Sequence, residues 1–254
     1  MLFVIDVGNT NTVLGLFEGA TLRKTWRLQT NTRKTEDEYG VLVRQLFDTA
    51  GVALGDVEAC VLASVVPPMT STIRKMVRRY FDTEPLVVGP GLKSGMPIRY
   101  ENPREVGADR IVNAVAAYAR TGGATIVVDF GTATTFDAIS EKGEYLGGCI
   151  CTGVVVSAEA LYLRASKLPR VDIAVPDQVI GRNTEASMQS GLVWGYVAMV
   201  DGMIERMRRE LSGDVHVVAT GGLAPLFAEH CSSIDAHDAD LTLTGLRLLF
   251  ERNR

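Results

Sequence analysis

Hydrophobic positions in the first half of the chain form short strand-like runs that alternate with helix-like repeats. These runs predict strands over residues 2–7, 12–18, 21–28, 57–66 and 86–88. The run over 57–66 is almost continuously apolar, as expected of a buried parallel strand. Apolar residues at helical spacing predict helices over 36–50 and 70–80, and Pro67 and Pro68 are expected to end the strand between them. Residues 89–103 are rich in Gly and Pro and predict a loop.

The second half repeats this plan after a junction helix predicted over 105–120. Its predicted strands cover 124–129, 134–140, 144–151 and 215–219, and its long predicted helices cover 154–166, 184–211 and 240–252. The order βββ-α-β-α-β is expected twice, which indicates an internal duplication of an α/β unit. We therefore expect two lobes, residues 1–120 and 121–254, with the final helix able to pack back on the first lobe.

An Asp-x-Gly hairpin motif occurs once in each half, between two apolar strands. A strand delivers its carboxylate to a fixed point, where it can hold a metal ion or the ion's water shell. The glycine lets backbone N–H groups approach phosphate oxygens, so two facing hairpins can hold one phosphate chain from both sides. Neither turn leads into a helix, which excludes a Rossmann dinucleotide site. The matched positions are Asp6 with Asp129, Gly8 with Gly131, and Thr12 with Thr135.

Charge and hydropathy exclude several functional classes. The net charge of −4 over 254 residues argues against a nucleic-acid partner. No stretch reaches the ~18 apolar residues of a membrane span, and the N-terminus lacks the basic segment of a signal peptide. We expect a cytoplasmic protein without a membrane partner. Solvated helix faces are expected for two basic clusters, Arg74/Lys75/Arg78/Arg79 and Arg206/Arg208/Arg209.

The cysteines and histidines do not form a metal-binding pattern. No CxxC pair occurs, and the histidines are not spaced as ligands with the cysteines. Cys60 and Cys149 lie in apolar strand patterns and are expected in the core. A structural zinc site or a disulfide framework is therefore not expected. The residues concerned are Cys60, Cys149, Cys151, Cys231, His216, His230 and His237.

Together with a Gly221-Gly222 turn after a later strand, the two hairpins are similar to those of the superfamily of acetate and sugar kinases, heat-shock ATPases and actin. A further motif, Gly107-Ala-Asp-Arg110, opens the junction helix. With this motif the whole chain resembles the type III pantothenate kinases. The resemblance implies an α/β fold of two ribonuclease-H-like lobes with ATP in the cleft between them. It also implies ATP-dependent phosphorylation of pantothenate to 4'-phosphopantothenate, the first step of coenzyme A synthesis.

The resemblance also implies the role of each site residue. Asp109 is the candidate general base, since it lies at a helix N-terminus that favours anions. Asp6 would hold Mg²⁺ through water, and Asp129 would hold a monovalent cation, K⁺ or NH₄⁺. The residues expected to bind ATP are Asp6, Val7, Gly8, Asn9, Thr10, Asn11, Thr12, Val13, Gly131, Thr132, Gly221 and Gly222. The residues expected to bind pantothenate are Tyr100, Gly107, Ala108, Asp109, Arg110 and Thr184.

Thr184 is the residue that bears on the oligomeric state. The resemblance implies that this threonine reaches pantothenate from the neighbouring subunit. The predicted helix after Thr184 is apolar on more than one face, which fits either a homodimer interface or deep burial in one lobe. Its apolar residues are Leu192, Val193, Trp194, Tyr196, Val197, Met199, Val200 and Met203. A homodimer with a shared active site is the resulting expectation.

Each residue also has an ordinary structural interpretation. Asp109 is then a helix-start residue, Arg110 a surface helix residue, Tyr100 a loop aromatic and Thr184 a helix N-cap. The Gly221-Gly222 pair is then a plain strand-to-helix turn.

The function has two alternatives. One is a non-catalytic ATP-binding transcriptional regulator of the same fold, and the other is a different small-molecule kinase such as a sugar kinase. The chain also departs from the family at Thr152, where a proline is usual.

Overall fold

The computed structural model describes residues 1–254, which form two compact units. The first unit comprises Met1–Met96, Glu101–Ala116 and Asp240–Arg254, and the second comprises Pro97–Tyr100 and Ala117–Ala239. Each unit holds one five-stranded sheet with the same strand plan, so the expected duplicated α/β fold class is confirmed.

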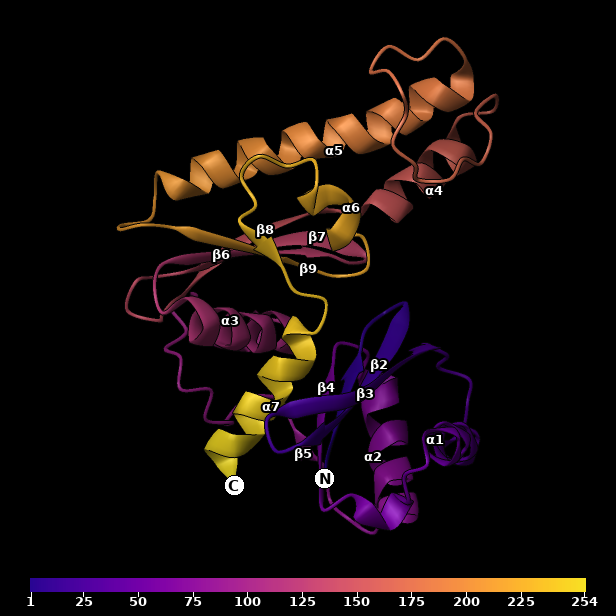
Figure 1. Ribbon diagram of the computed structural model, residues 1–254, viewed down its shortest axis with the longest axis vertical. Helices are drawn as coiled ribbons and strands as arrows, with labels where there is room; N and C mark the ends of the chain where they lie inside the picture. Colours follow the sequence, from indigo (N-terminus) through magenta and orange to yellow (C-terminus); the bar gives the residue numbers. More distant parts are fainter. The chain divides into compact units, whose positions relative to one another are not determined.

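The first unit is built on a sheet of order β3-β2-β1-β4-β5. Strand β2 pairs antiparallel with both β1 and β3. Strand β4 pairs in parallel with β1, and β5 pairs in parallel with β4. Helices α1 and α2 and the odd-numbered residues of β1 enclose the core of this unit. Helix α7 packs on β1 and β4 from the face opposite α2 (Figure 1). The strands are β1 (Leu2–Val7), β2 (Asn11–Glu18), β3 (Thr21–Gln29), β4 (Ala59–Ser64) and β5 (Leu86–Val87), and the helices are α1 (Glu36–Ala50), α2 (Pro67–Phe81) and α7 (Leu241–Asn253).

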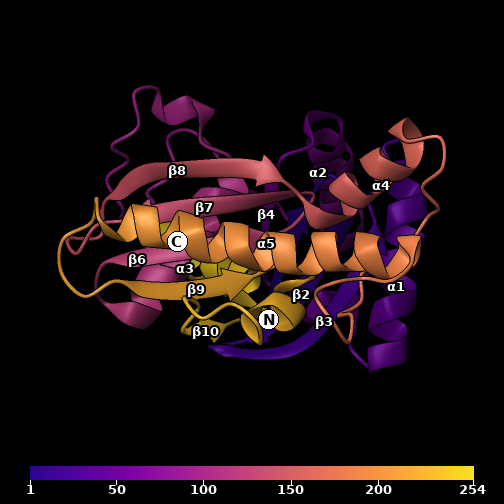
Figure 2. The ribbon, with the colours of Figure 1, turned by 90° about the horizontal axis from the view of Figure 1, so that it is seen from above.

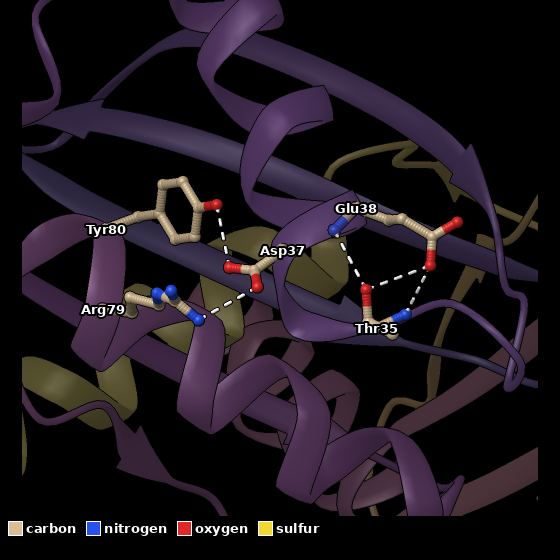
Figure 3. Close-up of polar contacts among 5 residues, drawn as sticks. All are labelled: Thr35, Asp37, Glu38, Arg79 and Tyr80. Carbon is tan, nitrogen blue, oxygen red and sulfur yellow. Dashed lines mark hydrogen bonds and ion pairs between the residues drawn. The ribbon is translucent and has the colours of Figure 1, made fainter.

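Local signals in the sequence explain how α1 begins and ends. Thr35 and Glu38 form a capping box, in which the Thr35 hydroxyl accepts from the Glu38 N–H and the Glu38 carboxylate accepts from the Thr35 N–H (Figure 3). Gly51 ends the helix in the left-handed conformation with φ 70°. These caps satisfy backbone groups that an uncapped helix leaves without partners.

Helices α1 and α2 are joined by polar contacts and by close packing at a glycine. The Asp37 carboxylate accepts from Tyr80 at 3.0 Å and pairs with Arg79 at 2.9 Å (Figure 3). A Cβ at Gly40 would lie 2.2 Å from the Tyr80 ring, so only glycine fits beneath that ring. Burial and the hydrogen bond to Asp37 both raise the pKa of Tyr80, which keeps its hydroxyl protonated as the donor.

The second unit repeats the sheet with order β10-β9-β6-β7-β8. Long helix α5 lies along one face of this sheet, and its N-terminal part extends past the sheet beside α4 (Figures 1 and 2). Phe130 and Phe227 stack in the core with ring centroids 4.9 Å apart. The strands are β6 (Thr125–Phe130), β7 (Ala133–Ile139), β8 (Tyr145–Thr152), β9 (His216–Thr220) and β10 (Ala236–His237), and the helices are α4 (Val154–Arg164), α5 (Thr184–Arg208) and α6 (Ala224–Ala228).

Several expected element boundaries were wrong. Helix α2 begins at Pro67 rather than after the Pro-Pro pair, because proline is well accommodated in the first turn of a helix. Helix α3 (Ala108–Thr121) begins later than 105, since Pro103–Glu105 forms a separate 3-10 turn. The second copy also has two helices, α4 and α5, between its third and fourth strands, so its order is βββ-α-α-β-α-β.

The apolar excess of α5 is explained by burial within its own unit. None of the eight apolar residues of α5 named in the sequence analysis is exposed, and Tyr196, Val197, Met199 and Met203 pack against the core as half-buried side chains. The ring of Trp194 packs edge-on against that of His230, 5.2 Å away. The exposed large apolar residues of this unit lie instead on β8, on α4 and in the segment before α5.

Candidate functional site

The first Asp-x-Gly hairpin is a tight turn at the end of β1. Asp6 stands opposite Val13, and the last pair of the ladder joins Val7 to Thr12. The Gly8 N–H donates to the Asn11 carbonyl at 3.0 Å, which closes the turn, while Asn9 and Thr10 at its tip are exposed. The tip therefore presents backbone and short polar groups to solvent, as an anion-binding turn requires.

The second hairpin has the same construction but is one residue shorter. Asp129 stands opposite Thr135, and the last pair joins Phe130 to Thr134. The Gly131 N–H donates to the Ala133 carbonyl at 3.1 Å. Thr12 therefore corresponds to Thr134 rather than to Thr135, which corrects the expected match. Both Thr12 and Thr134 are fully buried.

Gly221 lies directly against the second hairpin. Strands β9 and β6 run in parallel with Thr220 beside Asp129, so Gly221 follows at the same edge of the sheet. Gly221 has φ 94°, and a Cβ there would lie 2.5 Å from Asp129 Oδ1. Glycine is therefore required at 221 by its positive φ and by its close approach to the Asp129 side chain.

The Gly107-Ala-Asp-Arg110 motif forms the start of α3. The Asp109 carboxylate folds back over Gly107, where a Cβ would lie 2.5 Å from Asp109 Oδ1. The Arg110 N–H donates to the same oxygen at 2.8 Å. Glycine at 107 therefore makes room for the carboxylate, and the first turn of the helix fixes its position.

Burial raises the pKa of Asp109 above its ordinary value, and the hydrogen bond from the Arg110 N–H and the Arg110 charge oppose this shift. A carboxylate with a raised pKa is a better proton acceptor than an exposed one. Asp109 is half-buried, so part of its surface is accessible to solvent.

Arg110 and Tyr100 are both less exposed than residues on an open surface. Arg110 is buried with only 8% of its surface exposed, so it is not a surface helix residue. Tyr100 is half-buried, and its ring lies 6.4 Å from that of Tyr145. A Cβ at Gly147, which has φ 125°, would touch the Tyr100 ring at 3.4 Å. The Tyr100 ring is therefore held in place by its own unit.

Thr184 is exposed at the first position of α5 and is not the N-cap. The cap is Asn183, whose side-chain oxygen accepts from the Ala186 N–H at 2.8 Å. Thr184 lines a groove of about 1210 Å³ between α4 and α5. Thr152, where the resemblance led us to expect a proline, ends β8 opposite Ala133 and lines the same groove. Its carbonyl accepts from the Tyr196 hydroxyl at 2.8 Å.

Two residues that donate hydrogen bonds to the hairpins were not identified from the sequence. The Thr30 N–H donates to the Thr10 carbonyl at 2.9 Å, and the Gly153 N–H donates to the Thr132 carbonyl at 3.2 Å. Both follow directly after the third strand of their copy. That shared position, at the end of a strand next to the hairpin, is the signal that could have identified them.

Metal binding at these hairpins would need more ligands than the side chains supply. No group of three or more His, Cys, Asp or Glu side chains is arranged to hold a metal ion. Each hairpin offers one carboxylate, which fits an ion that takes its remaining ligands from water and phosphate oxygens. All four cysteines are free thiols. No helix has the length and apolarity needed to cross a membrane.

Comparison with known proteins gives matches over the full length of the chain. The family model of the type III pantothenate kinases matches residues 2–206. A type III pantothenate kinase of Myxococcus xanthus is 62% identical over 253 residues, which cover 100% of this chain and 99% of that protein. A type III pantothenate kinase of Geobacter sulfurreducens is 55% identical over 254 residues, which cover 100% of both.

Solved structures share the fold at low identity. A conserved putative Baf family transcriptional activator from Campylobacter jejuni is similar with a TM-score of 0.60 and 16% identity, over 99% of this chain and 98% of that one. A ROK hexokinase from Thermus thermophilus has a TM-score of 0.51 and 14% identity, over 98% and 97%. These similarities support the duplicated fold and carry no functional detail.

Proposed function

The chain belongs to the type III pantothenate kinase family, and from this premise we propose how its residues carry out the family's reaction. The protein is an enzyme that transfers a phosphoryl group from ATP to pantothenate, in coenzyme A synthesis. Full-length identity of 55% to 62% with type III pantothenate kinases carries this conclusion. It does not favour the transcriptional-regulator alternative.

Each of the two Asp-x-Gly hairpins is suited by its own construction to bind ATP phosphates. The exposed tips of both turns offer backbone N–H groups and short hydroxyls, which are suitable donors to phosphate oxygens. Asp6 would hold Mg²⁺ through water and Asp129 would hold K⁺ or NH₄⁺, and these cations would offset the phosphate charge. Gly221 keeps the backbone clear of the Asp129 carboxylate, and Gly222 at the exposed turn lets the nucleotide approach.

Asp109 acts on the primary hydroxyl of pantothenate, whose phosphorylation yields 4'-phosphopantothenate. The hydroxyl oxygen forms a bond to the γ-phosphorus, the bond from that phosphorus to the bridging oxygen of ADP breaks, and the hydroxyl proton passes to Asp109. A loose transition state needs the hydroxyl to be oriented more than it needs early deprotonation. Asp109 therefore accepts a hydrogen bond first and the proton late, a role that its raised pKa favours.

The pantothenate carboxylate is recognised by cationic and aromatic side chains. Arg110 offers a guanidinium that can bind a carboxylate through two hydrogen bonds, and its burial strengthens that interaction. Tyr100 supplies an apolar face and a hydroxyl, and its contact with Gly147 limits the orientations of its ring. Gly107 and Ala108 leave space next to Asp109 because neither carries a bulky side chain.

A homodimer completes the pantothenate site through Thr184. Support comes from the exposed apolar side chains near the start of α5, including Leu163 at 73% exposed and Ile180 at 82% exposed. Apolar surface of this extent is typical of an interface between subunits. A second copy that covers this region would bring its own Thr184 to the same interface, as the two-fold symmetry of a dimer requires.

A substrate panel tests the proposed function. The purified protein is incubated with ATP, Mg²⁺ and K⁺ and with pantothenate, hexoses or glycerol as the acceptor, and ADP formation is measured. ADP should form well above the no-acceptor rate only with pantothenate. Turnover of a hexose alone would place the protein among the sugar kinases, and ATP binding without turnover of any acceptor would favour the regulator.

A further inference from the structure

Thr30 makes three hydrogen bonds to the first phosphate hairpin. Its hydroxyl donates to the Gly8 carbonyl at 2.7 Å, and its N–H donates to the Thr10 carbonyl at 2.9 Å. Its hydroxyl also lies 2.9 Å from that of Thr12. One residue, outside the Asp-x-Gly motif, therefore contacts both ends and the tip of the turn.

The direction of these bonds follows from counting hydrogens. A threonine hydroxyl has one hydrogen to donate and can accept two. Since the Thr30 hydroxyl donates to Gly8, it must accept from the Thr12 hydroxyl. Thr12 is fully buried, so its hydroxyl depends on Thr30 as a partner. The chain Thr12 to Thr30 to Gly8 is thus fixed in one direction.

The second hairpin lacks this arrangement, which shows what the Thr30 side chain adds. Gly153 occupies the place of Thr30, and it keeps only the backbone bond, to the Thr132 carbonyl. A Cβ at Gly153 would lie 2.2 Å from that carbonyl oxygen and 2.6 Å from the Gly131 carbonyl oxygen. The buried hydroxyl of Thr134, the counterpart of Thr12, has no hydrogen-bond partner.

The two turns are therefore supported in different ways. In the shorter turn the Gly153 backbone lies against the Gly131 and Thr132 carbonyls and leaves no room for a side chain. In the longer turn of the first hairpin the Thr30 N–H bonds to the Thr10 carbonyl, and the Thr30 side chain adds a bond to the Gly8 carbonyl. Because a peptide group is planar, holding this carbonyl also fixes the direction of the Asn9 N–H, which belongs to the same peptide.

We propose that Thr30 is a positioning residue that holds the first hairpin in the conformation that binds the ATP phosphates. This inference rests on the proposed function, in which that hairpin binds phosphate. Thr30 itself is not expected to contact the nucleotide. It acts through the Gly8 and Thr10 peptides, so its loss should weaken ATP binding and leave pantothenate binding unchanged.

The test compares Thr30→Val, which removes the hydroxyl, with Thr30→Ser, which keeps it. Thr25→Val is the matched control, because Thr25 is an exposed threonine on β3. The KM for ATP, the KM for pantothenate, the Kd for ATP without acceptor and the Tm are measured for each. Thr30→Val should raise the KM and the Kd for ATP about tenfold, because the turn without these bonds populates the phosphate-binding conformation less often in the free protein.

The KM for pantothenate should change less than about twofold, and Thr30→Ser should restore ATP binding to within about threefold of wild type. A Thr30→Val protein with a lower Tm but an unchanged Kd for ATP would overturn the proposal, and so would equal rises in both KM values. If Thr30→Val does not fold, Thr30→Ala replaces it with the same expected result. A wild-type protein that binds ATP but does not phosphorylate pantothenate would contradict the proposed function, while the Kd for ATP would still test Thr30.

Discussion

Replacement of Gly221 by alanine perturbs the contact between β9 and the second hairpin. The added Cβ would lie 2.5 Å from Asp129 Oδ1 and 2.7 Å from backbone atoms of Phe130. The Phe130 backbone is held by the sheet, so the carboxylate has to move by about 0.9 Å to reach an ordinary contact of 3.4 Å. The positive φ of 94° adds ~1–2 kcal/mol of backbone strain for alanine.

Both activity and stability should fall. A displacement of ~1 Å in a site can cost about 100-fold in rate, so kcat/KM for ATP should fall by about that factor. The free energy of unfolding should fall by more than the ~1–2 kcal/mol of strain alone, because the collision adds to it. Gly51→Ala is the matched control, since Gly51 has φ 70° and a Cβ there would meet open space. Gly51→Ala should lower the free energy of unfolding through backbone strain and leave kcat/KM for ATP unchanged.

The assay measures ADP release at saturating pantothenate over a range of ATP concentrations, and urea unfolding gives the stability. The kcat/KM for ATP of Gly221→Ala is compared with that of Gly51→Ala, under conditions in which both variants are fully folded. A Gly221→Ala enzyme whose kcat/KM for ATP stays within about threefold of wild type would show that the position of the Asp129 carboxylate does not matter for nucleotide use.

Asp109→Asn should lower kcat by about 10²–10⁴ while ATP still binds, and near-normal turnover would make Asp109 a structural residue. Burial raises the pKa of Asp109 above 3.8, so the folded state holds the Asp109 proton more tightly than the unfolded chain does. The contribution of this group to stability is therefore lost as the pH rises through its folded-state pKa. The Tm of Asp109→Asn at pH 7 should therefore be no lower than that of wild type, and a lower Tm would contradict this effect of burial. The kcat of wild type should fall at acid pH, as Asp109 becomes protonated. Replacing K⁺ and NH₄⁺ by Na⁺ should abolish most activity, and Asp129→Ala should weaken that salt response; equal rates in all salts would rule out the cation site. Mixing inactive Asp109→Asn and Thr184→Arg chains should restore partial activity, because one site of each mixed dimer carries neither lesion; mixed dimers without activity would place Thr184 in its own subunit's pocket.

The sequence predicted the elements that depend on local signals. Two apolar runs and an Asp-x-Gly motif between them are enough to identify each hairpin, because both the strands and the turn are encoded within about fifteen residues. The duplicated sheet followed from repeating these signals. Helix starts were less predictable where two local rules compete, as at Pro67, which can end a strand or begin a helix.

Contacts between distant segments could not be read from the same signals. The hairpins have equal spacing from the aspartate to the matched threonines, yet their turns differ by one residue, so Thr12 corresponds to Thr134. Thr30 and Gly153 gain their roles from the pairing of a third strand beside the hairpin, so only their shared position directly after that strand marks them in the sequence. The burial of Arg110 likewise depends on packing around α3 and not on its position in the helix.

Direct identification of the product tests whether the enzyme phosphorylates the primary hydroxyl of pantothenate. The enzyme is incubated with ATP, Mg²⁺, K⁺ and pantothenate, and the product is analysed by mass spectrometry and by phosphorus NMR. We expect a monophosphate of pantothenate whose phosphorus couples to the protons of a CH₂ group, since the primary hydroxyl is the acceptor. A phosphorus that couples to a CH group, or ADP formed with free phosphate and unchanged pantothenate, would contradict this expectation.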